Sequence, residues 1–271
     1  MSDDLSGLEV LGSGRIATVY RLDGEHVLKV FHRPGEAAHE YHQVSQVWQT
    51  GVSCQQPLEC LEVGGQEAIV YSYVQGEDLG HWLERSPLRL PRCMALLADC
   101  HAPILRSVSD ELPALRNSLH HRIENAPYLN EYERGCLLAG LLSMPEGDAV
   151  LHGDLHPYNI VMLEGQPRAI DWVSANRGEP EADIARTFFL LRYAAQQDDR
   201  NCWDTMKRVA IHWLAARLYL RRIMRLTTVR WAGVRAWLPF VAAARLQEDP
   251  TNTEVQSILR LIVRFCRQVS Q

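Results

Sequence analysis

Residues 151–159 read Leu-His-Gly-Asp-Leu-His-Pro-Tyr-Asn, and residues 170–172 read Ile-Asp-Trp. Asp154 thus precedes Asn159 by five residues, and Asp171 follows Asn159 by twelve. Phosphoryl transfer to a hydroxyl group needs one carboxylate that accepts the hydroxyl proton. It also needs an amide oxygen and a second carboxylate that hold Mg²⁺ against the nucleotide phosphates. The spacing therefore predicts Asp154 as the base and Asn159 and Asp171 as the metal ligands.

Two short apolar runs, residues 160–163 and 168–170, flank a predicted turn at residues 164–167. They are typical of an antiparallel hairpin, which would bring Asn159 and Asp171 back to the same end. Taken singly, each polar residue of this region can cap a turn or satisfy nearby backbone groups. The combination of the spaced residues with the hairpin favours phosphoryl transfer.

A glycine-rich segment lies near the N-terminus, where residues 11–20 read Leu-Gly-Ser-Gly-Arg-Ile-Ala-Thr-Val-Tyr. Gly12, Ser13 and Gly14 predict a turn between two strands whose backbone N–H groups approach nucleotide phosphates closely. A Gly-Ser-Gly turn joins many hairpins, so this signal depends on its context. That context is three predicted strands, at residues 10–11, 19–22 and 26–31.

Lys29 lies inside the apolar strand 26–31, where a charge needs a partner or access to water. One interpretation is that Lys29 pairs with nucleotide phosphates and with a carboxylate on the next helix, predicted at residues 36–50. The alternative is that it points to solvent while its neighbours face the core. Glu40, on the buried stripe of that helix, is the preferred partner, and Glu36 near the helix start is the alternative.

Two further strands, at residues 56–62 and 67–74, are expected to form a hairpin around Gly64-Gly65. The second strand leads into a connection that we interpret as a hinge. The backbone from Ser72 to Val74 is expected to contact the adenine, with Tyr71 at the back of the pocket. An ordinary strand-to-helix connection is the alternative.

The rest of the chain is predicted to be mainly helical, with mixed apolar periodicity. The expected helices are at residues 88–106, 113–125, 131–142, 180–195, 201–225, 229–246 and 253–268. The fold class is therefore α+β with two lobes. Residues 1–75 are expected to form a small antiparallel β-sheet lobe that binds the nucleotide. Residues 76–271 are expected to form a helical lobe with the catalytic loop, the metal-binding hairpin and the acceptor site.

With these pieces in order, residues 8–193 resemble the aminoglycoside phosphotransferase and choline kinase-like superfamily of small-molecule kinases. The resemblance is strongest at residues 152–159 and 170–172. Gly153 and Trp172 stand where protein kinases typically carry Arg and Phe, which indicates the small-molecule branch. The resemblance implies a protein kinase-like fold, ATP or GTP with Mg²⁺, and a hydroxyl acceptor. It also implies that Asp183 braces the catalytic loop, whereas its alternative role is an acidic residue in a first helical turn. His152 is expected to orient the same loop.

The amino-acid composition narrows the kind of protein further. Hydrophobic content of 46% fits a globular protein, no apolar run has membrane length, and the chain opens Met-Ser-Asp-Asp, so a cytoplasmic enzyme without membrane association is expected. The seven cysteines form no CxxC pair, which argues against a zinc site or a disulfide framework.

The net charge of −5 is unevenly distributed, because residues 200–271 carry thirteen Arg and Lys against four Asp and Glu. These arginines are spread through apolar helices, so a solvated helix face is favoured over nucleic-acid binding. A basic C-terminal region disfavours a polycationic aminoglycoside and favours a neutral or singly charged hydroxylated acceptor. Glu77, Asp78, Glu146 and Glu179 are acidic residues that could still line a cleft.

Two other functions, a protein kinase and a nucleotide-binding regulator, stay open at this point. A protein kinase is disfavoured because the segment between Asp171 and the helix at Pro180 is too short for an activation segment. A nucleotide-binding regulator is disfavoured because Lys29, Asp154, Asn159 and Asp171 are all present. The sequence does not decide the acceptor, the choice of ATP or GTP, or the oligomeric state.

Overall fold

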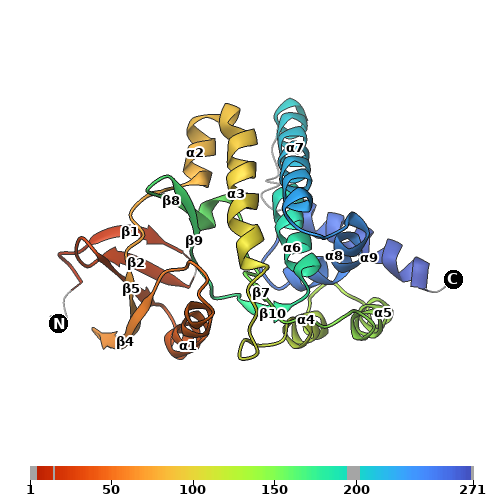
Figure 1. Ribbon diagram of the computed structural model, residues 1–271. Helices are drawn as coiled ribbons and strands as arrows, with labels where there is room; N and C mark the ends of the chain where they lie inside the picture. The colour runs from red at the N-terminus through yellow and green to blue at the C-terminus, as the bar shows by residue number, and fades with distance from the viewer. Residues whose placement is uncertain (1–4, 15, 194–201, 270–271) are drawn as a thin grey trace.

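The computed structural model describes residues 5–14, 16–193 and 202–269 of the chain. These residues form two lobes, a small antiparallel β-sheet with one helix and a larger, mainly helical region (Figure 1). The predicted two-lobed α+β fold is therefore confirmed. No helix among the described residues has both the length and the apolar character needed to cross a membrane.

The first lobe is built on a five-stranded antiparallel sheet and a single helix, α1. In spatial order its strands are β1 (Glu9–Ser13), β2 (Ala17–Arg21), β3 (His26–Phe31), β5 (Gln66–Ser72) and β4 (Pro57–Val63), and the helix is α1 (Glu36–Gln49). Gly64 and Gly65, with φ of 58° and 77°, form the predicted turn between β4 and β5. Positive φ at both positions is what a two-residue hairpin turn requires.

The alternation along β3 decides where Lys29 points. Leu28 and Val30 belong to one apolar cluster of the sheet, whereas Val27 and Phe31 belong to the main core. Successive strand residues face opposite sides. Lys29 therefore shares its face with Val27 and Phe31 and points toward the interior of the molecule, which excludes the solvent-facing alternative.

Two small sheets lie between the first lobe and the helices (Figure 1). Their strands are β6 (Glu77–Asp78), β8 (Ile160–Leu163) and β9 (Gln166–Ala169) in one sheet, and β7 (Ala149–Leu151) and β10 (Asn176–Gly178) in the other. The hairpin turn is shorter than predicted, because Gln166 and Pro167 already belong to β9. Glu164 and Gly165, with φ of 50° and 79°, form the turn by themselves. Pro167 is tolerated because β9 is an edge strand.

The helices of the second lobe follow the predicted ranges within a few residues. They are α2 (Leu79–Arg85), α3 (Leu90–Ile104), α4 (Leu115–Glu124), α5 (Glu131–Leu142), α6 (Pro180–Tyr193), α7 (Cys202–Leu226), α8 (Trp231–Arg245) and α9 (Asn252–Val269). The seven-residue helix α2, which Asp78 caps, was not predicted. The expected helix ends at 194–195 and 201 lie outside the described residues. Packing of α3 against α7 and of α6 against α8 places the start of α6 next to the predicted catalytic loop, residues 152–159.

Candidate active site

A cavity of about 730 Å³ opens between the two lobes. Residues from the glycine-rich turn, β3, α1, the predicted hinge and the β8–β9 hairpin line it. The predicted site residues that line it are Gly12, Ser13, Gly14, Lys29, Glu40, Val74, Asn159 and Asp171. Ser72 is not among the lining residues. Its N–H donates to Gln56 O at 3.0 Å, and its hydroxyl accepts from Gln56 N at 2.9 Å. Asp154 lies just beyond the lining.

Lys29 is held by two carboxylates. Its Nζ donates to Glu40 Oε1 at 2.8 Å and Oε2 at 3.0 Å, and to Asp171 Oδ1 at 3.1 Å. Burial tends to lower the pKa of Lys29, but the charges of Asp171 and Glu40 outweigh it and raise the pKa, so the ammonium stays charged. The Tyr71 hydroxyl donates to Glu40 Oε1 at 2.9 Å and fixes that carboxylate. The preferred partner, Glu40 rather than Glu36, therefore makes the contact.

Asn159 and Asp171 come together at one end of the β8–β9 hairpin, since Ile170 N donates to Asn159 O at 3.0 Å. The Asn159 Nδ2 group donates to Asp154 O at 2.9 Å, and this bond orients the amide within the lining of the cavity. Asp171 has a φ of 64°. A positive φ is uncommon for a residue other than glycine, and such strained backbone clusters at functional sites.

Asp183 on α6 holds the predicted catalytic loop in place through the backbone of the first two loop residues. This buried carboxylate accepts hydrogen bonds from His152 N at 2.7 Å and Gly153 N at 2.9 Å, and lies 3.0 Å from His101 Nε2. Burial raises the pKa of Asp183, but the bond from His101 and the neighbouring groups outweigh it and lower the pKa. The contacts are those of a brace, beyond what an acidic residue in a first helical turn requires.

His152 links the catalytic loop to the segment that carries Asp171. Its Nε2 donates to Ile170 O at 3.0 Å, and its Nδ1 accepts from Asp154 N at 3.3 Å. Burial lowers the pKa of His152, which keeps the ring neutral and allows one nitrogen to donate while the other accepts. The ring also packs against Trp172, with 4.5 Å between centroids. His152 thus couples the positions of Asp154 and Asp171.

We expect Asp183→Ala to lower the free energy of unfolding by about 3–5 kcal/mol, because it leaves two buried N–H groups and His101 without their acceptor. Urea unfolding monitored by circular dichroism measures this loss. Glu181→Ala, in the same first helical turn, is the matched control and should cost about 1 kcal/mol or less. Equal losses in the two variants would reduce Asp183 to an acidic residue that favours the helix N-terminus.

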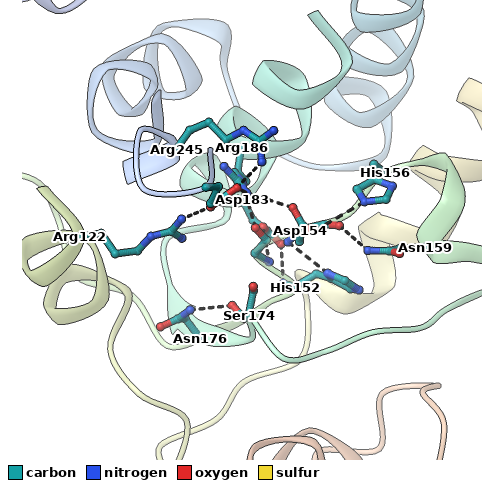
Figure 2. A network of polar contacts seen from close by, with 12 residues as sticks. Arg122, His152, Asp154, His156, Asn159, Ser174, Asn176, Asp183, Arg186 and Arg245 are labelled. Atoms are coloured by element: carbon teal, nitrogen blue, oxygen red, sulfur yellow. Dashed lines mark hydrogen bonds and ion pairs between the residues drawn. The ribbon is translucent and has the colours of Figure 1, made fainter. Parts of the chain in front are cut away.

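Asp154 itself is paired on two sides (Figure 2). Arg186 Nη2 donates to its Oδ1 at 3.0 Å, and His156 Nε2 lies 3.6 Å from its Oδ2. Burial raises the pKa of Asp154, but the His156 contact and the charge of Arg186 outweigh it and hold the pKa well below its usual range. Asp154 is therefore an anion at physiological pH.

Arg186 and Glu248 are the residues near Asp154 that sequence reasoning missed. Arg186 lies three positions after Asp183, on the same face of α6. A second charged residue on the face of Asp183, within a mainly apolar run, was the available signal. Glu248 follows α8, and nothing in its local sequence distinguishes it from a surface residue.

A family model described as "Phosphotransferase enzyme family" matches residues 7–221. No curated protein sequence matched the chain. Among solved structures, aminoglycoside phosphotransferase APH(4)-Ia is 16% identical, with a TM-score of 0.65 over 98% of this chain and 94% of that chain. The amicoumacin kinase hAmiN, in complex with AMP-PNP, Ca²⁺ and Ami, is 14% identical, with a TM-score of 0.59 over 98% and 89%.

A third structure is aminoglycoside phosphotransferase APH(3'')-Id from Streptomyces rimosus in complex with ADP and streptomycin. It is 19% identical, with a TM-score of 0.52 over 88% of this chain and 92% of that chain. At these identities the structural likeness establishes the fold. The family model covers the first lobe and the second lobe as far as α7, and does not reach α8 and α9. Together with the predicted resemblance, it shows that this chain belongs to the phosphotransferase enzyme family, with the fold of the small-molecule kinases.

Proposed function

We propose that this phosphotransferase moves the γ-phosphate of ATP or GTP to a hydroxyl group of a small molecule. One observation carries the proposal: Glu40 and Asp171 hold Lys29 in a cavity that Asn159 also lines. A charged lysine next to an Asp and an Asn is suited to a nucleotide triphosphate with its metal. Solved structures of similar fold contain AMP-PNP or ADP, which supports the nucleotide assignment.

Asn159 and Asp171 fit a magnesium ion by the chemistry of their donor atoms. They offer an amide oxygen and a carboxylate, and Mg²⁺ prefers such hard oxygens, taking one or two protein ligands together with substrate phosphates. Within the described residues no cluster of three or more His, Cys, Asp or Glu could hold a metal, so an all-protein cage is not offered. When bound, Mg²⁺ would neutralise charge on the β- and γ-phosphates.

The first lobe is proposed to bind the nucleotide. Gly12 and Ser13, the last two residues of β1, and Gly14, which follows them, line the cavity, so the predicted turn begins later than expected. Gly14 N donates to Ala17 O at 2.9 Å. Lys29 would hold the phosphates, with Glu40 keeping its ammonium in place. Val74, which lines the cavity, is the proposed adenine contact. The N–H of Ser72 is already bonded to Gln56 O, so it is not offered to the adenine.

We propose the division between lobes at residue 75, with residues 76–271 providing the catalytic loop and acceptor site.

Asp154 is the proposed base. Its low pKa keeps it ionised, so its carboxylate is always able to accept a hydrogen bond from the acceptor hydroxyl. A carboxylate whose pKa lies this far below neutral pH is a weak base. Its contribution therefore comes mainly from orienting the hydroxyl toward the γ-phosphate and from taking the proton late in the reaction.

The ion pairs near Asp154 indicate which charge the acceptor substrate can carry. Among the described residues the network next to it joins three arginines to two glutamates: Arg122, Arg186, Arg245, Glu248 and Glu254. Elsewhere, Glu77 and Glu146 are paired with Arg85 and Arg116. Several ammonium groups would need unpaired carboxylates when they lose water. We therefore propose a neutral or singly charged hydroxylated acceptor, reached from the helical lobe.

We expect transfer to neutral polyols, hydroxy acids or simple amino alcohols to be more efficient than transfer to aminoglycosides. A panel of such acceptors, with product detected by mass spectrometry and kcat/KM measured for each, tests this expectation. The antibiotic-kinase alternative makes the opposite prediction. Phosphorylation of a kanamycin-type substrate at low micromolar KM would overturn the proposed acceptor class.

A further inference from the structure

Arg186 joins the catalytic loop to the helical lobe through three different groups (Figure 2). Its Nε donates to Gly153 O at 3.0 Å, and its Nη2 donates to Asp154 Oδ1 at 3.0 Å. The same Nη2 donates to Glu248 Oε2 at 2.7 Å and Oε1 at 3.0 Å. One planar guanidinium therefore contacts two successive loop residues, Gly153 through its backbone and Asp154 through its carboxylate.

Arg186 is deeply buried, since its side chain is only 8% exposed. A buried charge needs paired charge of the opposite sign, which the carboxylates of Asp154 and Glu248 supply. Arg122 and Arg245 also bind Glu248, so this glutamate is fixed from three sides. Because three arginines share Glu248, Asp154 gives Arg186 a second carboxylate, and the bond to Gly153 O ties the same guanidinium to the loop backbone.

The two oxygens of the Asp154 carboxylate differ in how closely they are held. Oδ1 is hydrogen-bonded by Arg186 at 3.0 Å, whereas Oδ2 has only the looser ion pair with His156 Nε2 at 3.6 Å, which is longer than a direct hydrogen bond. The hydrogen bond between His152 and Asp154 is made by the Asp154 backbone N–H, which donates to His152 Nδ1. A carboxylate that is anchored at one oxygen can present the other in a fixed direction.

We infer that Arg186 is a positioning residue, which holds Asp154 Oδ1 so that Oδ2 faces the acceptor hydroxyl. This inference rests on the proposed function, because it assigns the fixed carboxylate to that reaction. The guanidinium is suited to this task because its fork has a rigid geometry, which a lysine ammonium lacks. Glu248 is the anchor that keeps the fork in place.

Three substitutions and one control test the inference. Arg186→Gln should lower kcat about 100-fold, the loss expected for a small misplacement of a reacting group. Arg186→Lys should lie between Arg186→Gln and the wild type. Guanidinium ions should restore part of the turnover of Arg186→Ala, since the missing group is small and the vacated space is polar. Nucleotide affinity, measured by calorimetry, should change by less than about twofold in all three, because Arg186 does not line the nucleotide cavity.

Arg122→Gln is the matched control, because Arg122 binds the same glutamate but makes no hydrogen bond to Asp154. It should reproduce any loss of thermal stability that comes from the network and lower kcat much less than Arg186→Gln does. Equal loss of kcat in Arg122→Gln and Arg186→Gln would overturn the inference and leave a purely structural network.

Crystal structures of Arg186→Gln and wild type separate this inference from the proposed function. A shifted or rotated Asp154 carboxylate in the variant supports the inference even when no acceptor in the panel is phosphorylated. An unmoved carboxylate overturns it even when the wild type proves to be an active kinase. Failure of the proposed function would instead appear as a wild-type protein that transfers phosphate to no hydroxyl compound.

Discussion

Asp154→Asn should retain nucleotide binding and lose about 100- to 10,000-fold in turnover, the usual range for removal of a general base. The substitution is nearly isosteric, and Arg186 keeps Glu248 as a partner, so the fold is expected to persist. Steady-state kinetics with a phosphorylated-product readout give kcat, and calorimetry with a non-hydrolysable nucleotide gives the affinity. The two measurements together separate loss of chemistry from loss of binding.

Asp99→Asn is the matched control for this substitution. Asp99 pairs with Arg222 on the surface of the helical lobe, away from the cavity between the lobes. Exposed pairs of this kind contribute little to stability, so the control should behave like the wild type. Turnover by Asp154→Asn at a rate close to that of Asp99→Asn would remove Asp154 from the role of base.

Asp171→Ala should weaken magnesium-dependent nucleotide binding by at least about 100-fold, more than Asp154→Asn does. Loss of a group that merely supports a metal ligand already costs about 10- to 100-fold, and a direct carboxylate ligand supplies charge that water does not replace. Titration of Mg²⁺ at a fixed nucleotide concentration measures the effect. Lys29 keeps Glu40 as its partner in the variant, so its ammonium stays in place.

Asn159→Ala should show a milder form of the same defect, because an amide oxygen carries no net charge. Its Nδ2 bond to Asp154 O would also be lost, so a small decrease in kcat should accompany the weaker metal dependence. Identical magnesium titrations for wild type and Asp171→Ala would mean that the β8–β9 hairpin does not hold the metal.

The sequence was sufficient wherever the structure follows a local pattern. The buried stripe of α1 favoured Glu40 as the partner of Lys29, and the structure joins the two at 2.8 Å. The period of two in β3 left either face open for Lys29, and the packing of its neighbours decided between them. The apolar runs around Glu164-Gly165 predicted the hairpin, although not the exact length of its turn. Each of these features depends on residues that are close in the chain.

Features that depend on distant partners were not predictable in this way. Strand β10 has three residues and exists because it pairs with β7, and β6 has two and pairs with β8. The contact between Arg186 and Glu248 joins residues 62 positions apart, after α7 and α8 have folded back toward the loop. Periodicity shows that a face is buried, but it does not show which residue a buried charge will meet.

The most direct test of the central claim follows the γ-phosphate itself. Wild type and Asp154→Asn are incubated with γ-¹⁸O-labelled ATP or GTP, Mg²⁺ and the panel of hydroxylated small molecules, and the label is located by mass spectrometry. We predict that the wild type places the labelled phosphoryl group on a hydroxyl of at least one small molecule, and that Asp154→Asn does so at most about one hundredth as fast. Label that appears only in inorganic phosphate, at the same rate in both proteins, would contradict the account.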